Sequence, residues 1–245
     1  MHHQRHPARS EQGPDHETEL CAADLDALRG VDTCSLANAI ETFATRLRNE
    51  GYAGPGLHCI FREMPPVLGF AVTARVRSSN PPVTGGAYFD RSDWWAHVFD
   101  QPTPRFAVVE NLEANAAASA IAGEIHCEIL RALGCVALVT NGAVRDLPAV
   151  RETGFALFAN GVAPSHAYLH LVDFGGPVDI FGLSVRPGDL LCGDCHGLIS
   201  IPHQLVKQLP AVLEELAQHE RTVIDLCRSP EFSLERLRET VKNMA

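Results

Sequence analysis

The stretch GEIHCEILRALGCVALVTNGAVRD, residues 123 to 146, is the most informative part of the chain for the fold. It predicts a helix from Glu124 to Leu133, about 15 Å long, and a returning strand from Cys135 to Thr140, about 20 Å long. Because the two run in opposite directions over similar lengths, the helix N-terminus should meet the loop Asn141 to Asp146 at one edge of the sheet. Open α/β sheets bind ligands at that edge.

Groups of three kinds converge at this predicted edge. The backbone N–H groups of Glu124, Ile125 and His126 lie at the positive end of the helix dipole and suit an anion such as a carboxylate. Arg145 can bind the same anion through two hydrogen bonds. Asp146 and Glu124 bring two carboxylates together, which is favourable around a hard divalent cation and costly without one. The pattern therefore predicts a site for an anionic oxo acid and Mg²⁺.

Each of these residues also has an ordinary structural explanation. Asp146 precedes Leu147-Pro148 and could be only a helix N-cap, with proline in the first turn. Arg145 could be a surface residue of the loop, and Glu124 a first-turn acid favoured by the helix dipole. It is the expected convergence of the three that favours the functional interpretation.

Elements outside this stretch are predicted from hydrophobic periodicity and turn residues. Helices are predicted over Ala22 to Arg29, from Asp32 or Thr33 to about Asn49, over Asn115 to Leu133 with an interruption at Gly123, over Leu147 to Glu152, from His203 to about Cys227 with a kink or break at Pro210, and after Ser229-Pro230. Strands are predicted over Val67 to Val76, Phe106 to Glu110, Phe155 to Ala159 and, as two or three short strands, within Val178 to Ile201. This order predicts an α/β fold with a mixed sheet or two sheet layers.

The composition is that of a globular protein. The chain has 245 residues, of which 46% are hydrophobic and 20% charged, enough for one large domain or two small ones. Residues 1–18 are expected to be a disordered polar tail, and residues 19–245 a single domain whose C-terminal helices span 203–245. We expect a soluble cytoplasmic protein that does not contact membranes, because no signal-peptide core or bilayer-length apolar run is visible.

Charge narrows the possible chemistry. Acidic residues outnumber basic ones by 30 to 20, and the net charge is −10, so nucleic acid is not expected as a direct partner. The only lysines are Lys207 and Lys242, both in predicted C-terminal helices away from the proposed edge. A reaction that must stabilise an enolate would therefore rely on a metal acting as Lewis acid rather than on a lysine Schiff base.

The same residues carry a resemblance to a known family. GEIHCEILRALGCVALVTNGAVRD, followed by RETGFALFANGVAP and VRPGDLLCGDCHGLISIP, is similar to the RraA-like family over residues 123 to 202, and GFAVTARV at 69 to 76 and DTCSLANAI at 32 to 40 extend the similarity weakly. The family includes class II 4-hydroxy-4-methyl-2-oxoglutarate and 4-carboxy-4-hydroxy-2-oxoadipate aldolases and the regulator of ribonuclease E activity. The resemblance implies a swivelling β/β/α domain that forms a homotrimer or homohexamer with active sites between subunits.

The resemblance also implies roles for the charged residues. Arg145 matches the arginine that holds the carboxylate and oxo group of the substrate. Asp146 matches the ligand of Mg²⁺ or Mn²⁺, and Glu124 matches the acid that holds metal-bound water. A glutamate from the C-terminal helix of a neighbouring subunit completes the metal shell in the family, and Glu220 is the nearest positional match.

The resemblance also covers backbone amides after Gly123, and three nearby residues depart from the family pattern. The amides after Gly123, those of Ile125 and His126, match the ones that bind the pyruvyl carboxylate. His126 and Cys127 stand where the family tends to have leucine and alanine, so His126 is either a new acid or base or a space-filling residue. Ala149 stands where the family usually has an acid.

These observations predict a divalent-metal-dependent lyase. It would cleave a 4-hydroxy-2-oxo acid to pyruvate by a retro-aldol reaction, decarboxylate oxaloacetate, or do both. Mg²⁺ on Asp146 would chelate the 2-oxo carboxylate, Arg145 would neutralise the developing enolate charge, and water near Glu124 would carry the proton. The alternative is a non-catalytic binding or regulatory protein of the same family.

Two further groups of residues could bind a metal or cofactor. Cys192-Gly-Asp-Cys195-His196 matches the short pattern for c-type haem attachment or a thiol redox pair, although the resemblance aligns Asp194 with an Asp-rich turn and makes the cysteines incidental. His166, His170 and Asp173 have a spacing that could suit a metal, but a loop is the simpler explanation. Trp94-Trp95 and His97 border either the pocket or a subunit surface.

Overall fold

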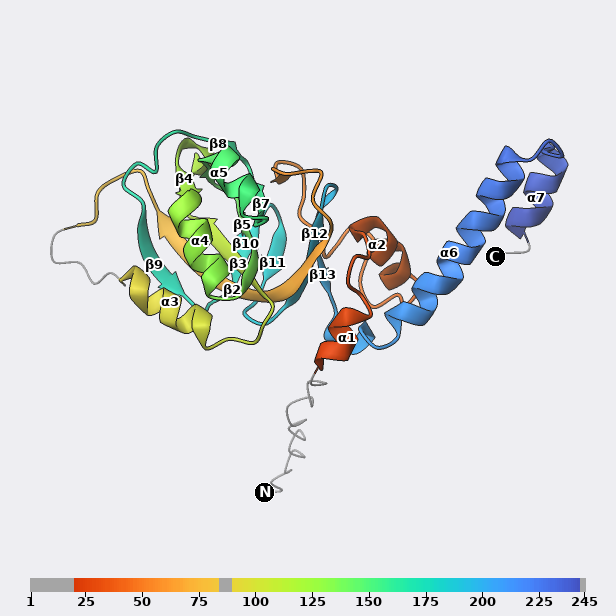
Figure 1. Ribbon diagram of the computed structural model, residues 1–245, viewed down its shortest axis with the longest axis horizontal. Helices are drawn as coiled ribbons and strands as arrows, with labels where there is room; N and C mark the ends of the chain where they lie inside the picture. Colours follow the sequence, from red (N-terminus) through yellow and green to blue (C-terminus); the bar gives the residue numbers. More distant parts are fainter. Residues whose placement is uncertain (1–19, 84–89, 243–245) are drawn as a thin grey trace, which may run out of the picture.

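The computed structural model describes residues 20–83 and 90–242, and the predicted tail, residues 1–18, lies outside them (Figure 1). The helices are α1 (Ala22–Asp26), α2 (Thr33–Glu41), α3 (Arg91–Phe99), α4 (Glu124–Ala132), α5 (Leu147–Glu152), α6 (Leu209–Arg228) and α7 (Leu234–Lys242), with 3-10 helices η1 (Ala116–Ala118) and η2 (His203–Leu205). The strands are β1 (His58–Cys59), β2 (Val67–Arg77), β3 (Arg105–Asn111), β4 (Ala120–Ala122), β5 (Cys135–Thr140), β6 (Ala143–Val144), β7 (Ala156–Ala159), β8 (Gly161–Val162), β9 (His170–Phe174), β10 (Val178–Ile180), β11 (Leu183–Val185), β12 (Leu190–Asp194) and β13 (Gly197–Ile201).

One large mixed sheet organises the fold. Its order is β1-β7-β5-β3-β2-β12-β13, and β9 also pairs with β2. The central strands β7, β5, β3 and β2 are parallel, whereas β1, β12, β13 and β9 pair in antiparallel fashion. β2 has two antiparallel partners on one side, because residues 67–70 pair with β12 and residues 74–77 with β9. The predicted α/β class with a mixed sheet is confirmed.

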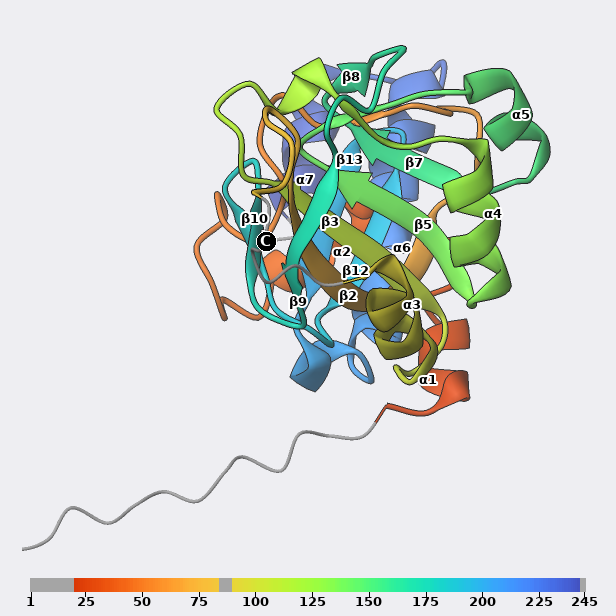
Figure 2. The ribbon, with the colours of Figure 1, turned by 90° about the vertical axis from the view of Figure 1, so that its left-hand side faces the viewer.

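Both faces of the central strands are buried. In β5, Leu138 points to a cluster that includes side chains of α3, α4 and α5, whereas Ala137 and Val139 point to a cluster that includes the β10–β11 hairpin. Figure 2 shows α3 and α4 on the near side of the sheet. Burial on both faces explains why β5 reads as a continuous apolar run rather than as alternating polar and apolar residues.

A third cluster joins the N- and C-terminal helices to the sheet. Buried side chains of α1, α2 and the start of α6 pack on β12 and β13. α6 packs on this cluster as far as Leu216 and then projects away from it, and α7 turns back alongside α6 (Figure 1). Leu209 is the only fully buried residue of α6. None of the helices in the described ranges is long and apolar enough to cross a membrane.

Two predicted helices have different boundaries in the structure. The helix expected to reach Asn49 ends at Glu41, and Ala44 soon afterwards has a left-handed backbone with φ 48°, which no helix can continue through. The helix expected over Asn115 to Leu133 is divided into η1, β4 and α4. Pairing of β4 with β6 outweighs the helical propensity of its alanine-rich sequence.

Other differences concern the late hairpins, the start of α6 and the segment before β3. The region Val178 to Ile201 contains four strands in two hairpins instead of two or three strands. The helix predicted from His203 is broken just before Pro210 into η2 and α6, and Pro210 itself lies in the first turn of α6, where its missing N–H costs nothing. The segment Arg91–Phe99, for which no helix was predicted, forms α3 behind an Asp90 capping box.

A buried carboxylate attaches α2 to the large sheet. Asp194, only 4% exposed, accepts hydrogen bonds at 2.8 Å from the Thr33 N–H, the Thr33 hydroxyl and the His196 N–H. Burial by itself raises the pKa of Asp194, but these hydrogen bonds outweigh it, so the pKa lies below its ordinary value. The ionised carboxylate therefore stabilises the folded state.

We expect Asp194→Ala to lower the free energy of unfolding at pH 7 by roughly 3 kcal/mol, because two backbone donors and a hydroxyl lose a charged acceptor. The lowered pKa means that this stabilisation is present above pH 3.8 and is lost as the pH falls below that value. Urea unfolding at pH 7 and at pH 3 measures both effects. Asp225→Ala, on the exposed part of α6, is the control, and an equal loss at both pH values would contradict the assignment.

Candidate functional site

A small parallel sheet brings the sequence-predicted residues together. β4 pairs with β6, and β6 pairs with β8. α4 begins directly after β4, and α5 begins directly after β6, so Gly123 lies beside Arg145 and Asp146. The Arg145 N–H donates to the Ala122 carbonyl at 3.0 Å. The helix N-terminus and the loop after β5 therefore meet at one edge.

Asp146 turns its side chain away from its own helix. Its backbone holds the N-cap position of α5 in a left-handed conformation (φ 57°), but its carboxylate makes no capping bond there. Instead Oδ2 accepts a hydrogen bond from the Glu124 N–H at 3.2 Å and lies 3.4 Å from Arg145 Nε. The side chain is thus not a cap for α5. The N-terminus of α4 and the guanidinium both stabilise its negative charge.

Gly123 makes room for this contact. A Cβ at Gly123 would lie 2.2 Å from Asp146 Oδ2 and 2.9 Å from Arg145 Cγ. The backbone at Gly123 is extended (φ −136°), a conformation that any residue can adopt. The need for glycine is therefore one of space and not of conformation.

These groups open onto a cavity of about 410 Å³. A volume of this size suits a small organic ligand. The first intrahelical bond of α4 is donated by Cys127, so the N–H groups of Ile125 and His126 precede it. The lining combines charged side chains with an apolar wall. It consists of Arg91, Trp95, Ala120, Ile121, Ala122, Gly123, Glu124, Ile125, His126, Ile129, Arg145, Asp146, His166 and Leu169.

His126 belongs to the apolar wall. Its ring meets Trp94 and Trp95 edge-on, with centroid distances of 5.7 and 6.5 Å. Burial, with a smaller contribution from Arg91, lowers the pKa of His126 to about 4. The imidazole is therefore neutral at pH 7 and has no proton to donate there, which favours the space-filling interpretation over that of a general acid.

The other candidate groups of the sequence lie elsewhere. His166 lines the cavity, whereas Asp173 forms an ion pair with Arg75. In the described ranges, His166, His170 and Asp173 do not gather into a metal-binding cluster. Trp94 is buried in the core, and the His97 ring lies 5.2 Å from that of Phe174.

In the motif of residues 192–196, one cysteine is buried in the core and the other lies in a turn at the surface. Cys192 is 1% exposed and packs with α1 and α2, and burial raises the pKa of its thiol to about 12. Cys195 and His196 form the turn between β12 and β13. Because Cys192 is enclosed in the core, the two cysteines do not present a joint site for haem attachment.

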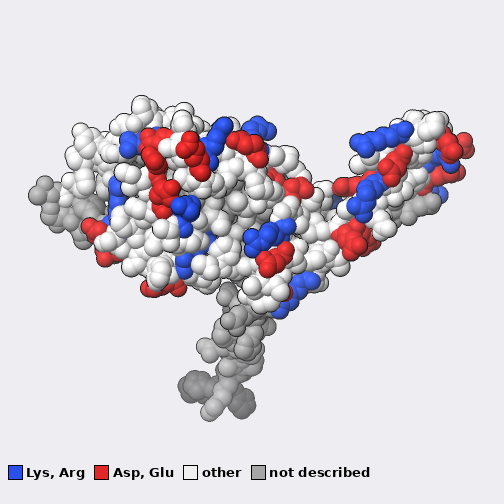
Figure 3. Space-filling model, in the orientation of Figure 1, with Lys and Arg blue, Asp and Glu red and all other residues white. Residues whose placement is uncertain are grey.

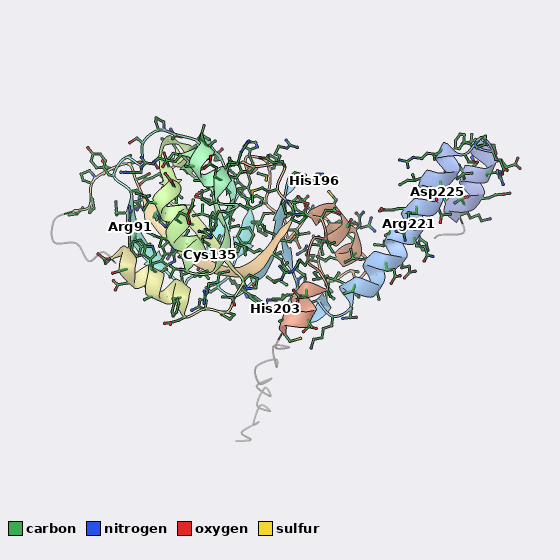
Figure 4. All side chains as sticks on the ribbon, viewed as in Figure 1. Arg91, Cys135, His196, His203, Arg221 and Asp225 are labelled. Carbon is green, nitrogen blue, oxygen red and sulfur yellow. The ribbon has the colours of Figure 1, made fainter. Side chains whose placement is uncertain are left out.

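Neither lysine lines the cavity. Lys207 lies in the turn before α6, not in a helix as predicted, and its Nζ is 3.8 Å from Asp24 Oδ2. Lys242 ends α7. Glu220 is exposed on α6, next to Arg221, which Figure 4 shows on the projecting helix, on the opposite side of the molecule from the cavity residue Arg91. Glu220 therefore does not reach the cavity of its own chain.

The structure adds one charged residue to the lining and places another residue for which two positions were open. Arg91 carries no signal of its own in the sequence, whereas Trp95 lines the cavity, which is one of the two positions expected for the Trp94-Trp95 pair. Both are brought to the cavity by α3, whose docking against α4 is a tertiary contact. On the face drawn in Figure 3, acidic and basic side chains are interspersed, and neither covers a continuous area.

Comparison with protein families identifies the chain. The family model RraA-like, described as Aldolase/RraA, matches residues 33–200. The chain belongs to the RraA-like family. This family includes both aldolases and inhibitors of RNase E, and the match covers β4, α4 and the Arg145-Asp146 pair.

Two relatives of this RraA-like protein match over shorter stretches. A protein of Halalkalibacterium halodurans, provisionally named a 4-hydroxy-4-methyl-2-oxoglutarate aldolase, is 32% identical over 84 residues, which are 34% of this chain and 40% of the relative. An uncharacterized protein of Methanocaldococcus jannaschii is 25% identical over 120 residues, which are 49% of this chain and 58% of that protein. The chain thus spans about half the length of these relatives.

Solved structures show the same RraA-like fold. An uncharacterized protein from Pseudomonas syringae superimposes with a TM-score of 0.71 at 24% identity, covering 94% of this chain and all of that one (100%). RraAS2 of Streptomyces coelicolor, described as an unusual member of the RNase ES inhibitor RraA family, gives 0.65 at 21% identity, covering 83% of this chain and 96% of that one. The predicted RraA-like fold is confirmed.

We expect Gly123→Ala to displace the Asp146 carboxylate from α4 while the chain still folds, because the added methyl group collides with a side chain and not with backbone. The amide signal of Glu124 in ¹H–¹⁵N NMR should then shift toward its position in Asp146→Ala. Gly161→Ala in β8 is a matched control, since a Cβ there meets nothing within 4 Å. An unmoved Glu124 signal in Gly123→Ala would show that the site tolerates the methyl group.

Proposed function

We propose that this protein is a divalent-metal-dependent lyase that releases pyruvate from a 4-hydroxy-2-oxo acid by retro-aldol cleavage. Decarboxylation of oxaloacetate would follow the same course, because both reactions pass through the enolate of pyruvate. The proposal rests on one observation above all. The Asp146 carboxylate, the Arg145 guanidinium and the N-terminus of α4 meet over Gly123 at a cavity of about 410 Å³.

The residues at this edge fit a hard cation such as Mg²⁺ or Mn²⁺. Asp146 offers a carboxylate in the space left by Gly123, and Glu124 is an exposed acid on the first turn of α4. Mg²⁺ is commonly held by one or two carboxylates together with water and substrate oxygens. When bound there, the cation would supply Lewis-acid stabilisation of the negative charge on the substrate's 2-oxo group.

The protein's own groups would hold and orient the substrate. The N–H groups of Ile125 and His126, at the positive end of α4, would bind the carboxylate next to the oxo group. Arg145 would donate to the oxo oxygen and stabilise the charge that develops as the C3–C4 bond breaks. Glu124 would accept the proton of the 4-hydroxyl group through an intervening water, and that proton would return to C3 to give pyruvate.

The site would be completed by a neighbouring copy of the chain. One subunit supplies two acids to the edge, whereas Glu220 lies on the projecting part of α6, far from its own cavity (Figure 4). A homotrimer or homohexamer would bring Glu220 of one subunit to the Asp146 of the next. Formation of an oligomer also explains why Ile224, Phe232, Leu234 and Val241 are exposed on α6, α7 and their connection.

A non-catalytic role as a binding or regulatory protein is the second candidate. Its support is Ala149 on α5, where the resemblance leads us to expect an acid. Calorimetric titration with Mg²⁺ and pyruvate or oxalate separates the two candidates. A lyase should bind the oxo acid more tightly when Mg²⁺ is present, whereas an interaction protein should show no such coupling.

We expect purified protein to release pyruvate from 4-hydroxy-2-oxoglutarate or oxaloacetate, and EDTA to abolish that release. Arg145→Ala should lower kcat/KM by at least about 100-fold, because one preorganised donor to the oxyanion is lost. A coupled lactate dehydrogenase assay measures pyruvate directly. Arg151→Ala, on α5 but outside the cavity, is the matched control. Undiminished turnover in EDTA would overturn the metal role.

The shared site can be tested by complementation. Asp146→Asn and Glu220→Gln should each be inactive alone, but their co-expressed mixture should regain activity at roughly a quarter of the sites, where both intact residues meet at random. A chain that carries both substitutions controls for residual activity. If Glu220→Gln alone retains full activity, then Glu220 does not complete the site.

A further inference from the structure

The turn between β12 and β13 gathers three different metal-binding side chains. Asp194 ends β12, and Cys195 and His196 form the turn. Their ligand atoms all lie within 4.8 Å of one another, and no other such group occurs in residues 20–83 and 90–242. Figure 4 shows His196 at the tip of this hairpin near α2, well separated from the cavity residue Arg91. The cluster is thus distinct from the Asp146 site.

The distances within the cluster match those expected around a tetrahedral ion. Cys195 Sγ lies 3.5 Å from His196 Nδ1, and the same nitrogen lies 3.3 Å from Asp194 Oδ1. Zinc bonds of about 2.3 Å to sulfur and about 2.0 to 2.1 Å to nitrogen or oxygen, at tetrahedral angles, give edges of about 3.6 and 3.3 Å. Two of the three edges of one tetrahedral face therefore already have the expected length, and the third pair of atoms, Cys195 Sγ and Asp194 Oδ1, lies within 4.8 Å.

We propose that Asp194, Cys195 and His196 form a second metal site, selective for Zn²⁺ or a similar borderline-soft cation. Sulfur and imidazole ligands favour such ions over Mg²⁺, which prefers oxygen. An ion can reach the turn from solvent, because the His196 side chain is 55% exposed and Cys195 is partly exposed. Binding replaces the thiol proton of Cys195 with the metal, so one proton is released for each ion bound.

The surroundings of the turn favour a cation. The carboxylate of Asp194 is held in the charged form by its hydrogen bonds. The nearby Asp32 is held in the charged form too, because its hydrogen bonds with Ser35 lower its pKa despite burial and the charge of Asp194. Burial, with a smaller contribution from the negative charge of Asp194, raises the pKa of the Cys34 and Cys59 thiols, so both stay neutral at pH 7. The negative charge at the turn is therefore that of Asp194 and Asp32, and a cation bound there would offset their repulsion.

Thr33 would act as the support for the metal-binding carboxylate. Its N–H holds Asp194 Oδ2 at 2.8 Å, and its hydroxyl donates to Oδ1. The hydroxyl can turn away when Oδ1 binds a metal, while the N–H keeps the carboxylate oriented. Because Thr33 begins α2, an ion at the turn would strengthen the junction between α2 and the β12–β13 hairpin.

Titration of the full chain with Co²⁺, in the presence of excess Mg²⁺, tests the site. We expect one equivalent to produce a thiolate-to-cobalt charge-transfer band, and Zn²⁺ to displace the Co²⁺ and raise Tm. Cys195→Ser should abolish the band and the rise in Tm, and His196→Gln should weaken Co²⁺ binding at least tenfold. Cys21→Ser and Cys227→Ser, which alter exposed thiols elsewhere, should leave both signals unchanged.

The outcomes separate the proposed site from simpler explanations. The N-terminal histidines cannot produce the band, because the first cysteine of the chain is Cys21. A band that survives Cys195→Ser overturns the site. If the band needs Cys195 but the His196→Gln variant binds Co²⁺ as tightly as the unaltered chain, the signal comes from a reactive thiol alone. That result overturns the proposal too. Pyruvate release is not part of this test, so its result is independent of the proposed lyase activity.

Discussion

The contact between the Asp146 carboxylate and the first amide of α4 is the interaction on which the proposed site depends. It requires a missing Cβ at Gly123, a left-handed backbone at Asp146, and the pairing of β4 with β6 that brings the two segments together. The same contact places Arg145 beside the helix N-terminus. A carboxylate, a guanidinium and a helix dipole then act on one small volume, where a negatively charged substrate and a cation can be held together.

The two candidate metal sites differ in the chemistry of their ligands. The net charge of −10 makes anion binding unfavourable unless positive charge is supplied locally. Oxygen ligands around Asp146 suit a hard cation that also neutralises the substrate, whereas sulfur and nitrogen at Cys195 and His196 suit a softer ion. The first site would serve chemistry at the edge of the small sheet. The second would serve the junction of α2 with the large sheet.

Prediction from sequence succeeded where local signals and tertiary contacts agree. β5 was predicted with its observed bounds, because a buried central strand is a short apolar run with turn residues on both sides. α4 was predicted to within a residue of its end, since Gly123 and Gly134 mark its boundaries. β4 was assigned to a helix, because three residues rich in alanine carry no strand signal until β6 lies beside them. α3 was missed although Asp90 and Asp93 form a capping box at its start, and with it the part of the cavity wall formed by Arg91 and Trp95.

The sequence by itself determined the family through the similarity of its motifs, and the mixed α/β class through the order of elements along the chain. It also determined the convergence of a helix N-terminus with the Arg145-Asp146 pair, because element lengths along one short stretch bring them to the same edge. Only the tertiary structure decided which way the side chains point. It turned Asp146 toward α4 instead of α5, packed His126 edge-on against two tryptophans, and carried Glu220 away from its own cavity on a projecting helix. Such choices depend on packing between segments distant in sequence, which no local pattern encodes.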